Sequence, residues 1–231
     1  MKHFITSLKV TPAVACIWVL ATISMASFPG DKLGAQTDPI EAWLDHGRGC
    51  LDGVFSLEAD FTQETIHVLG GDMEVMEGTV QLRRGSRIRL EYKKPQRLLV
   101  VSDGKVVRAW NPGTRTVIEG SSRKDMVALA FGFVLGDQKV EAFDTRFVGG
   151  DAKPVKGSRG VVELVSRTPI PLVERILLTM EGSCPSVSRV VLIDHAGTAT
   201  RFTLTNVKTN TGIGHKRFIF VPPKGAKIIR P

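Results

Sequence analysis

Residues 77–112 alternate between apolar and polar side chains with a period of two, and this constrains the fold more than any other feature of the chain. Side chains of a β-strand point alternately to opposite faces, so the pattern predicts short strands rather than a helix. Ile88, Leu90 and Tyr92 share one face of one such strand, and charged residues occupy the other. Turn residues such as those at 85–86 separate the strands. The stretch therefore predicts an antiparallel meander whose apolar face must be covered by another part of the chain.

Further strands are predicted before and after this meander, and two helices accompany them. One helix begins at Asp38-Pro39, and the other is the strongly apolar segment 126–135, which we expect to be capped by Ser121-Ser122 and ended by Gly136. The other predicted strands lie at 55–68, 73–82, 116–118, 140–148, 161–166, 173–180, 187–194 and 199–208, and a last apolar stretch lies at 217–221. This order predicts a mainly β (α+β) fold, in which a strongly curved antiparallel sheet forms an incomplete β-barrel and helices cover its concave face as a lid.

The N-terminus has the pattern of an export signal. Lys2 and Lys9 precede an apolar run at 13–23, and small residues follow up to Ala26. The run is shorter than the roughly 20 apolar residues that span a bilayer, so we expect a cleaved signal peptide at residues 1–26, with cleavage as late as residue 35, rather than an anchor. Residues 36–231 are expected to form a single exported domain.

Charge and cysteine content limit the remaining possibilities. The formal net charge is +8, but the basic residues are interspersed with acidic ones and no basic patch is interleaved with aromatic residues, so a solvated basic face is favoured over nucleic-acid binding. Of the three cysteines, Cys16 lies in the predicted signal. Cys50 and Cys184 are left as either one disulfide or two buried thiols.

A search for catalytic or metal-binding motifs finds little. The histidines are scattered singly, so no pair has the spacing of metal ligands, and phosphate-binding and nucleophile-elbow motifs are absent. Ser121 and Lys124 match S-x-x-K, the only basis for a hydrolase, but the companion S-D-N and K-T-G motifs are missing. A helix-capping serine explains the match more simply, so we expect no enzyme, cofactor or metal.

Arg84 breaks the pattern of the meander. It continues the inward parity of Val80 and Leu82, and a guanidinium facing an apolar interior costs several kcal/mol unless it finds acceptors. Two explanations remain open. Either the strand bulges or ends there and Arg84 points to water, or Arg84 is a polar latch near the mouth of an apolar cavity and bonds to backbone carbonyls of the lid.

An ordered set of short motifs extends over nearly the whole mature chain. The motifs are Ala59-Asp60-Phe61-Thr62-Gln63, the block 77–95 with Arg84 in place, Leu99 to Gly104, Asn111-Pro112, and 218–225. Together they resemble the periplasmic outer-membrane lipoprotein carrier protein family (LolA-like). The chain departs from the family in having Gly85 where a proline usually follows the arginine, and the aliphatic residues Ile88 and Leu90 where aromatic residues are usual.

The resemblance implies a periplasmic, non-enzymatic carrier with an incomplete β-barrel lidded by helices. Such a carrier takes the acyl chains of lipoproteins from an inner-membrane ABC transporter to an outer-membrane receptor or the outer membrane itself. The family's inward arginine, which bonds to the lid and holds the empty cavity shut, would correspond to Arg84. We expect a monomer. The alternative is an envelope lipid-binding or lipoprotein-sensing interaction protein on the same fold.

Ten apolar residues are candidates for lining the acyl-chain cavity, although plain core packing would produce the same sequence pattern. They are Leu82, Ile88, Leu90, Tyr92, Leu98, Val100, Trp110, Met126, Leu129 and Phe133.

Overall fold

A computed structural model describes residues 39–67, 73–122, 125–138, 140–150, 159–184 and 186–230. Every described residue belongs to the compact unit formed by residues 37–231. The export signal and its cleavage site lie outside the described residues, so both stay predictions.

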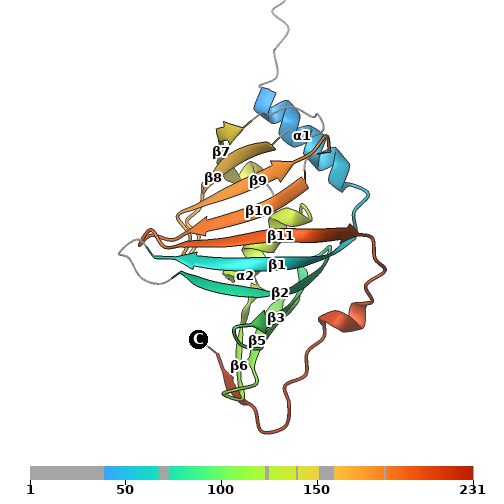
Figure 1. The fold of residues 1–231 in the computed structure, drawn as a ribbon, viewed down its shortest axis with the longest axis vertical. Helices are drawn as coiled ribbons and strands as arrows, with labels where there is room; N and C mark the ends of the chain where they lie inside the picture. The colour runs from blue at the N-terminus through green and yellow to red at the C-terminus, as the bar shows by residue number, and fades with distance from the viewer. Residues whose placement is uncertain are drawn as a thin grey trace, which may run out of the picture. The chain divides into compact units, whose positions relative to one another are not determined.

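Twelve strands form one sheet in the order β12-β6-β5-β4-β3-β2-β1-β11-β10-β9-β8-β7 (Figure 1). The strands are β1 (Ser56–Ile66), β2 (Glu74–Arg83), β3 (Arg87–Lys94), β4 (Leu98–Asp103), β5 (Val106–Asn111), β6 (Thr116–Ser121), β7 (Phe143–Gly150), β8 (Arg159–Ser166), β9 (Arg175–Glu181), β10 (Ser186–Ile193), β11 (Ala199–Thr209) and β12 (Lys227–Ile229). Neighbours are antiparallel except β12, which runs parallel to β6. Within the described residues β12 and β7 do not pair, so the sheet is open, as the mainly β, incomplete-barrel prediction requires.

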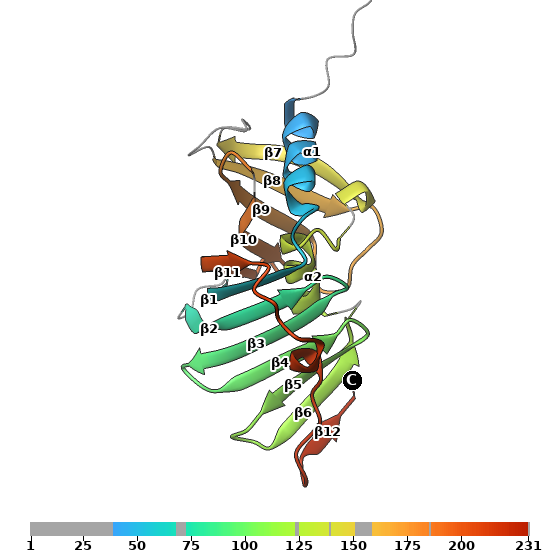
Figure 2. The same cartoon turned by 90° about the vertical axis from the view of Figure 1, so that its right-hand side faces the viewer.

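The helices α1 (Pro39–Leu51) and α2 (Met126–Val134) lie on the same face of the sheet (Figure 2). Trp43 of α1 and Phe131 of α2 belong to one buried core, together with the residues of the sheet that point to this face. We call this the inner face and the opposite one the outer face. The apolar face of the meander is thus covered by helices, as predicted.

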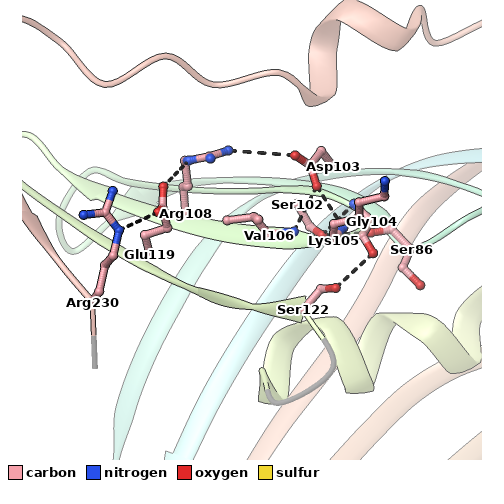
Figure 3. Close-up of polar contacts among 10 residues, drawn as sticks. All are labelled: Ser86, Ser102, Asp103, Gly104, Lys105, Val106, Arg108, Glu119, Ser122 and Arg230. Atoms are coloured by element: carbon pink, nitrogen blue, oxygen red, sulfur yellow. Dashed lines mark hydrogen bonds and ion pairs between the residues drawn. The ribbon is translucent and has the colours of Figure 1, made fainter.

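The start of α2 differs from the prediction. Its N-cap is Asp125, whose carboxylate accepts a hydrogen bond from the backbone N–H of Ala128 at 2.9 Å. Ser121 ends β6, and the Ser122 hydroxyl donates to the carbonyl oxygen of Gly104 at 3.0 Å (Figure 3). Serine at 121–122 and aspartate at 125 are both good capping residues. Asp125 is the cap because β6 extends to Ser121, three residues beyond the predicted strand, and the helix starts later. Lys124 lies outside the described residues.

The chain after α2 also differs in detail from the predicted strands. Residues 140–142 form a short 3₁₀ helix, η2, before β7, whereas they were predicted to be the first residues of that strand. The apolar stretch at 217–221 is not a strand, because part of it belongs to a second 3₁₀ helix, η3 (His215–Phe218). β12 was not predicted, since three residues are too few to show a period.

Residues 210–226, the C-terminal strap, cross the outer face of the sheet. η3 lies against β3 and β4, where Phe218 is fully buried and Ile213 is nearly so. Arg83 donates to the carbonyl oxygen of Ile213 at 3.0 Å, and Arg217 forms an ion pair with Glu91 at 3.3 Å. The strap thus gives the outer face a small core of its own.

A disulfide joins Cys50 of α1 to Cys184 in the turn between β9 and β10, with 5.7 Å between the two Cα atoms. His46 Nε2 donates to the carbonyl oxygen of Ser183 in the same turn at 2.9 Å. The end of α1 is therefore covalently attached to the half of the sheet that lies beyond β11.

Close packing between α1 and β8 leads to a prediction. A Cβ atom on Gly160 would lie 2.5 Å from Cη2 of Trp43 and 3.1 Å from Cε2 of Phe147, and the fully buried ring has little room to move. Gly160→Ala should lower the free energy of unfolding by about 1–3 kcal/mol through overpacking, measured by chemical denaturation. Gly149→Ala is the control, because its Cβ would meet nothing within 4 Å. Equal stability of the two variants would show that α1 is not packed as described.

Candidate functional site

Nine of the ten candidate cavity residues lie in the core between the inner face and α2. Those buried there are Leu82, Ile88, Leu90, Tyr92, Val100 and Phe133. Those partly buried and packed against it are Leu98, Met126 and Leu129. The strands and α2 thus bring together residues that are up to 51 positions apart in the sequence.

Trp110 lies on the opposite side and corrects the predicted set. It pairs with Leu99, whose other partner is Glu91, so its side chain belongs to the outer face. Its ring lies 6.5 Å from that of Phe220 in the strap, and it lines an outer pocket of about 560 Å³ that also touches Tyr92 and Leu98. Val107 and Ala109 point inward instead, whereas Trp110 shares its face with the charged Arg108, and this parity was the signal in the sequence that could have placed it on the outer face.

The inner face is filled by aromatic side chains of α2. The ring of Phe131 lies 5.2 Å from that of Phe202 and 6.5 Å from that of Phe61, and Phe133 lies 5.4 Å from Phe143. Every residue from Ala128 to Val134 except Leu129 is buried. A short helix that is apolar all round is stable only between apolar surfaces. Sequence reasoning missed Phe131, since a helix that is apolar all round shows no preferred face, and it missed Phe202, although that residue follows the alternation of β11.

Arg84 is the first residue of the three-residue turn between β2 and β3. Its Nε donates to the carbonyl oxygen of Val54 at 2.8 Å, and its Nη2 donates to that of Leu51, the last residue of α1. The guanidinium lies 5.7 Å from the centre of the Phe55 ring. Phe55 precedes β1, although the predicted strand began at residue 55, and its side chain is largely exposed.

These contacts combine the two explanations considered for Arg84. The strand does end before it, at Arg83, but its guanidinium bonds to backbone carbonyls of the helical cover. The last carbonyls of a helix lack partners within the helix and carry partial negative charge, so a cation is favourable there. The bonded helix is α1, whereas the sequence had indicated 126–135 as the lid.

The same turn also holds the chain after α2. The carboxylate of Asp137 accepts hydrogen bonds from the backbone N–H of Ser86 at 2.8 Å and from that of Gly85 at 3.2 Å. Residues 84–86 therefore contact both helical segments, α1 through a side chain and α2 through the backbone. Asp137 was missed by sequence reasoning, since an acidic residue after a helix-ending glycine is an ordinary surface residue.

One polar group of side chains lies within the apolar interior. The Tyr92 hydroxyl donates to Oε1 of Gln63 at 2.7 Å, and both side chains are buried. Burial raises the pKa of Tyr92 well above its ordinary value, and the negative charge of Asp125 raises it further. Burial also raises the pKa of the Asp125 carboxyl, although the backbone N–H groups of Ala128 and Val127 oppose this. The N-terminus of α2 is therefore capped by a carboxylate whose ionisation the fold disfavours.

The raised pKa of Asp125 predicts a pH dependence of stability. A carboxyl with a folded pKa above its unfolded pKa gives stability that is present at low pH and is lost as the pH rises through the folded pKa. Asp125→Asn keeps a capping side chain but cannot ionise. The melting temperature of the variant minus that of the wild type should therefore increase as the pH is raised from about 4. Thermal unfolding across a pH series measures this difference. Parallel curves for the two proteins would contradict this.

The described residues contain no group of three or more His, Cys, Asp or Glu side chains that could hold a metal ion. None of the helices in the described ranges is long and apolar enough to cross a bilayer. The arrangement is that of an open β-sheet protein whose apolar inner face is covered by helices, and no chemistry is concentrated there beyond a few hydrogen-bonding groups.

This arrangement agrees with the comparison to known families. The family model described as outer membrane lipoprotein carrier protein LolA matches residues 52–221. The chain belongs to this family.

Two relatives agree with this assignment, and a solved structure shows a similar fold. The outer-membrane lipoprotein carrier protein of Pseudomonas syringae pv. tomato is 28% identical over 179 residues, which cover 76% of this chain and 82% of the relative. That of Bordetella avium is 25% identical over 180 residues, covering 77% and 82%. An uncharacterised conserved protein from Thermus thermophilus has a similar fold, with a TM-score of 0.51 and 16% identity over 84% of this chain and all of that one.

Proposed function

We propose that this protein carries lipoproteins by binding their acyl chains against the inner face of the sheet, in the space that α2 occupies in this structure. The observation that carries the proposal is the filling of that space by Phe131 and Phe133, on a helix that is apolar all round. Apolar contacts are non-directional, so acyl chains can replace the aromatic side chains once α2 moves aside. The names of the relatives support the same cargo.

The energetics suit a carrier that must also release its cargo. Burial of acyl chains contributes about 0.8 kcal/mol for each CH₂ group removed from water. Displacement of α2 exposes its buried aromatic side chains and breaks the bonds of Asp137 to the turn, which offsets much of this gain. A small net free energy allows handover to an acceptor that binds the acyl chains more tightly.

The proposed route follows from the family to which the chain belongs. The mature chain, from about residue 36 onward, acts in the periplasm as a monomer without catalysis or a cofactor. It receives lipoproteins from an inner-membrane ABC transporter and delivers them to an outer-membrane receptor or to the outer membrane itself. The latch role of Arg84 is part of this proposal, supported by its bonds to the end of α1.

The cargo itself gives the first test. Protein purified from the periplasm and analysed by native mass spectrometry should retain triacylated protein. Free phospholipid as the only bound molecule would contradict lipoprotein carriage and would support the envelope lipid-binding alternative. A bound protein without acyl chains would point instead to a lipoprotein-sensing or other interaction role.

Arg84→Leu tests the latch. Loss of its bonds to Leu51 of α1 and to Val54 should loosen the β2–β3 turn, which also holds Asp137 beyond α2, and so favour the open state. The variant should load lipoprotein but retain it, with transfer to acceptor membranes reduced at least tenfold in a release assay. Arg83→Leu is a matched control, because Arg83 contacts the strap on the outer face and not α1. Transfer by Arg84→Leu at the wild-type rate would exclude a latch.

A further inference from the structure

The charge of the chain is concentrated at one end of the sheet. Residues 83–119 and 210–231 together contain 15 Lys and Arg but only three Asp and Glu, although the whole chain has a net charge of +8. Residues 210–231 alone contain five cations and no acid. These two segments are β3 to β6 with their turns, and the strap with β12, which lie side by side (Figure 2). The fold thus places a strongly basic surface at this end, while the rest of the chain is net negative.

The acidic groups at this end are already neutralised. Glu119 lies between Arg108 at 2.8 Å and Arg230 at 2.9 Å, and Asp103 lies 3.9 Å from Arg108 (Figure 3). Hydrogen bonds from Arg230 and Arg108 hold the pKa of Glu119 below its ordinary value. Glu91 is paired with Arg89 and Arg217. The three carboxylates are thus paired with four arginines.

The cations at the tip of this end are exposed and have no acidic partner among the described residues. Arg115 donates only to the carbonyl oxygen of Lys224, at 2.9 Å, which keeps its charge uncompensated. Lys224 and Lys227 form no side-chain bond within the described ranges, and both are exposed. Arg115 and Lys227 are also joined through the backbone, where the Lys227 N–H donates to the Arg115 carbonyl at 2.9 Å. Three uncompensated charges are therefore held together where β12 pairs with β6.

Exposed aliphatic side chains lie among these cations. Ile118 of β6 is 50% exposed and pairs with Ile229 of β12, which is 40% exposed. Val221 in the strap is 78% exposed, and Ile219 is 55% exposed. Single exposed apolar residues are common, but Ile118 and Ile229 are direct neighbours across β6 and β12, and Val221 precedes Lys224 by three residues in the strap. We call these side chains, together with Arg115, Lys224 and Lys227, the tip surface.

We propose that the tip surface binds the headgroup region of an anionic phospholipid membrane. Juxtaposed cations attract an anionic lipid surface, and short aliphatic side chains beside them add contact with the boundary between headgroups and acyl chains. The exposed residues project from an edge rather than lining a concave site, so they suit a surface that is recognised by its charge density. An acidic protein partner is less well matched, because a protein interface requires a complementary contour around a buried centre.

This binding is separate from the proposed cargo site. The tip surface includes no residue of the inner core that α2 covers, so the inference stands or falls independently of lipoprotein carriage. Contact would be reversible and sensitive to salt, because exposed charges are screened at high ionic strength. It would place a carrier at the bilayer without anchoring it there.

Vesicle flotation tests the inference. Purified protein lacking residues 1–36, which leaves the compact unit intact, is mixed with vesicles of phosphatidylcholine alone or of phosphatidylcholine with phosphatidylglycerol. We expect flotation only with the anionic vesicles, and its loss at high salt. Lys224→Glu and Lys227→Glu should each weaken binding at least tenfold, since each cation near an anionic surface contributes about fivefold and the substitution changes two charges.

Further variants distinguish an effect of the tip surface from an effect of net charge or of misfolding. Lys208→Glu makes the same change in charge at an exposed position on β11, and it should leave flotation within about twofold of the wild type, because its charge is screened over the distance to the tip surface. Val221→Ser removes an exposed aliphatic side chain without changing charge, and it should weaken binding to the anionic vesicles. Circular dichroism of each variant confirms folding.

Three outcomes would overturn the inference. They are equal flotation with neutral and anionic vesicles, no flotation with either, and equal loss in Lys208→Glu and Lys224→Glu. Retention on immobilised polyglutamate at a salt concentration where anionic vesicles are not bound would assign the tip surface to an acidic protein instead.

Discussion

The turn between β2 and β3 holds the helical cover on the sheet, and the arrangement of the interior depends on it. Its first residue, Arg84, bonds through its side chain to the end of α1, and the backbone N–H groups of Gly85 and Ser86 bond to Asp137 beyond α2. Hydrogen bonds that involve charged groups are stronger than neutral ones and fix direction. The apolar contacts that make up most of the burial fix neither position nor orientation. A few polar bonds at one turn therefore determine where a largely apolar cover sits.

The two faces of the sheet differ in how they are covered. The inner face is covered by separate helices that meet it through apolar contacts, whereas the strap crosses only part of the outer face, where Arg83 and Arg217 bond it to the sheet. Arg217 donates to Gln81 as well as pairing with Glu91, so it connects the strap to two strands. A sheet supported from outside in this way can keep its form while the cover on its inner face is rearranged.

The fold and much of the inner face follow from the sequence, because the period of two is a local property of each strand. The parity of Ile88, Leu90 and Tyr92 was enough to place all three inside. Trp110 was placed inside because of its apolar ring, although it shares its parity with Arg108, and the strap that buries its ring on the outer face could not be foreseen from the local pattern. β12 and the partner of Arg84 could not be predicted, since both depend on contacts between segments more than 30 residues apart. The family was inferred from the order of several short motifs along the chain, because no single residue is specific to it.

The disulfide between Cys50 and Cys184 divides the cover into two parts with different freedom. Cys50 lies one residue before Leu51, so the end of α1 that Arg84 holds is also tied covalently to the β9–β10 turn. α2 has no such tie, and among the described residues Asp137 alone holds its end to the β2–β3 turn. Any rearrangement of the cover that keeps the disulfide intact would therefore involve mainly α2, because α1 is held to the sheet both covalently and by Arg84.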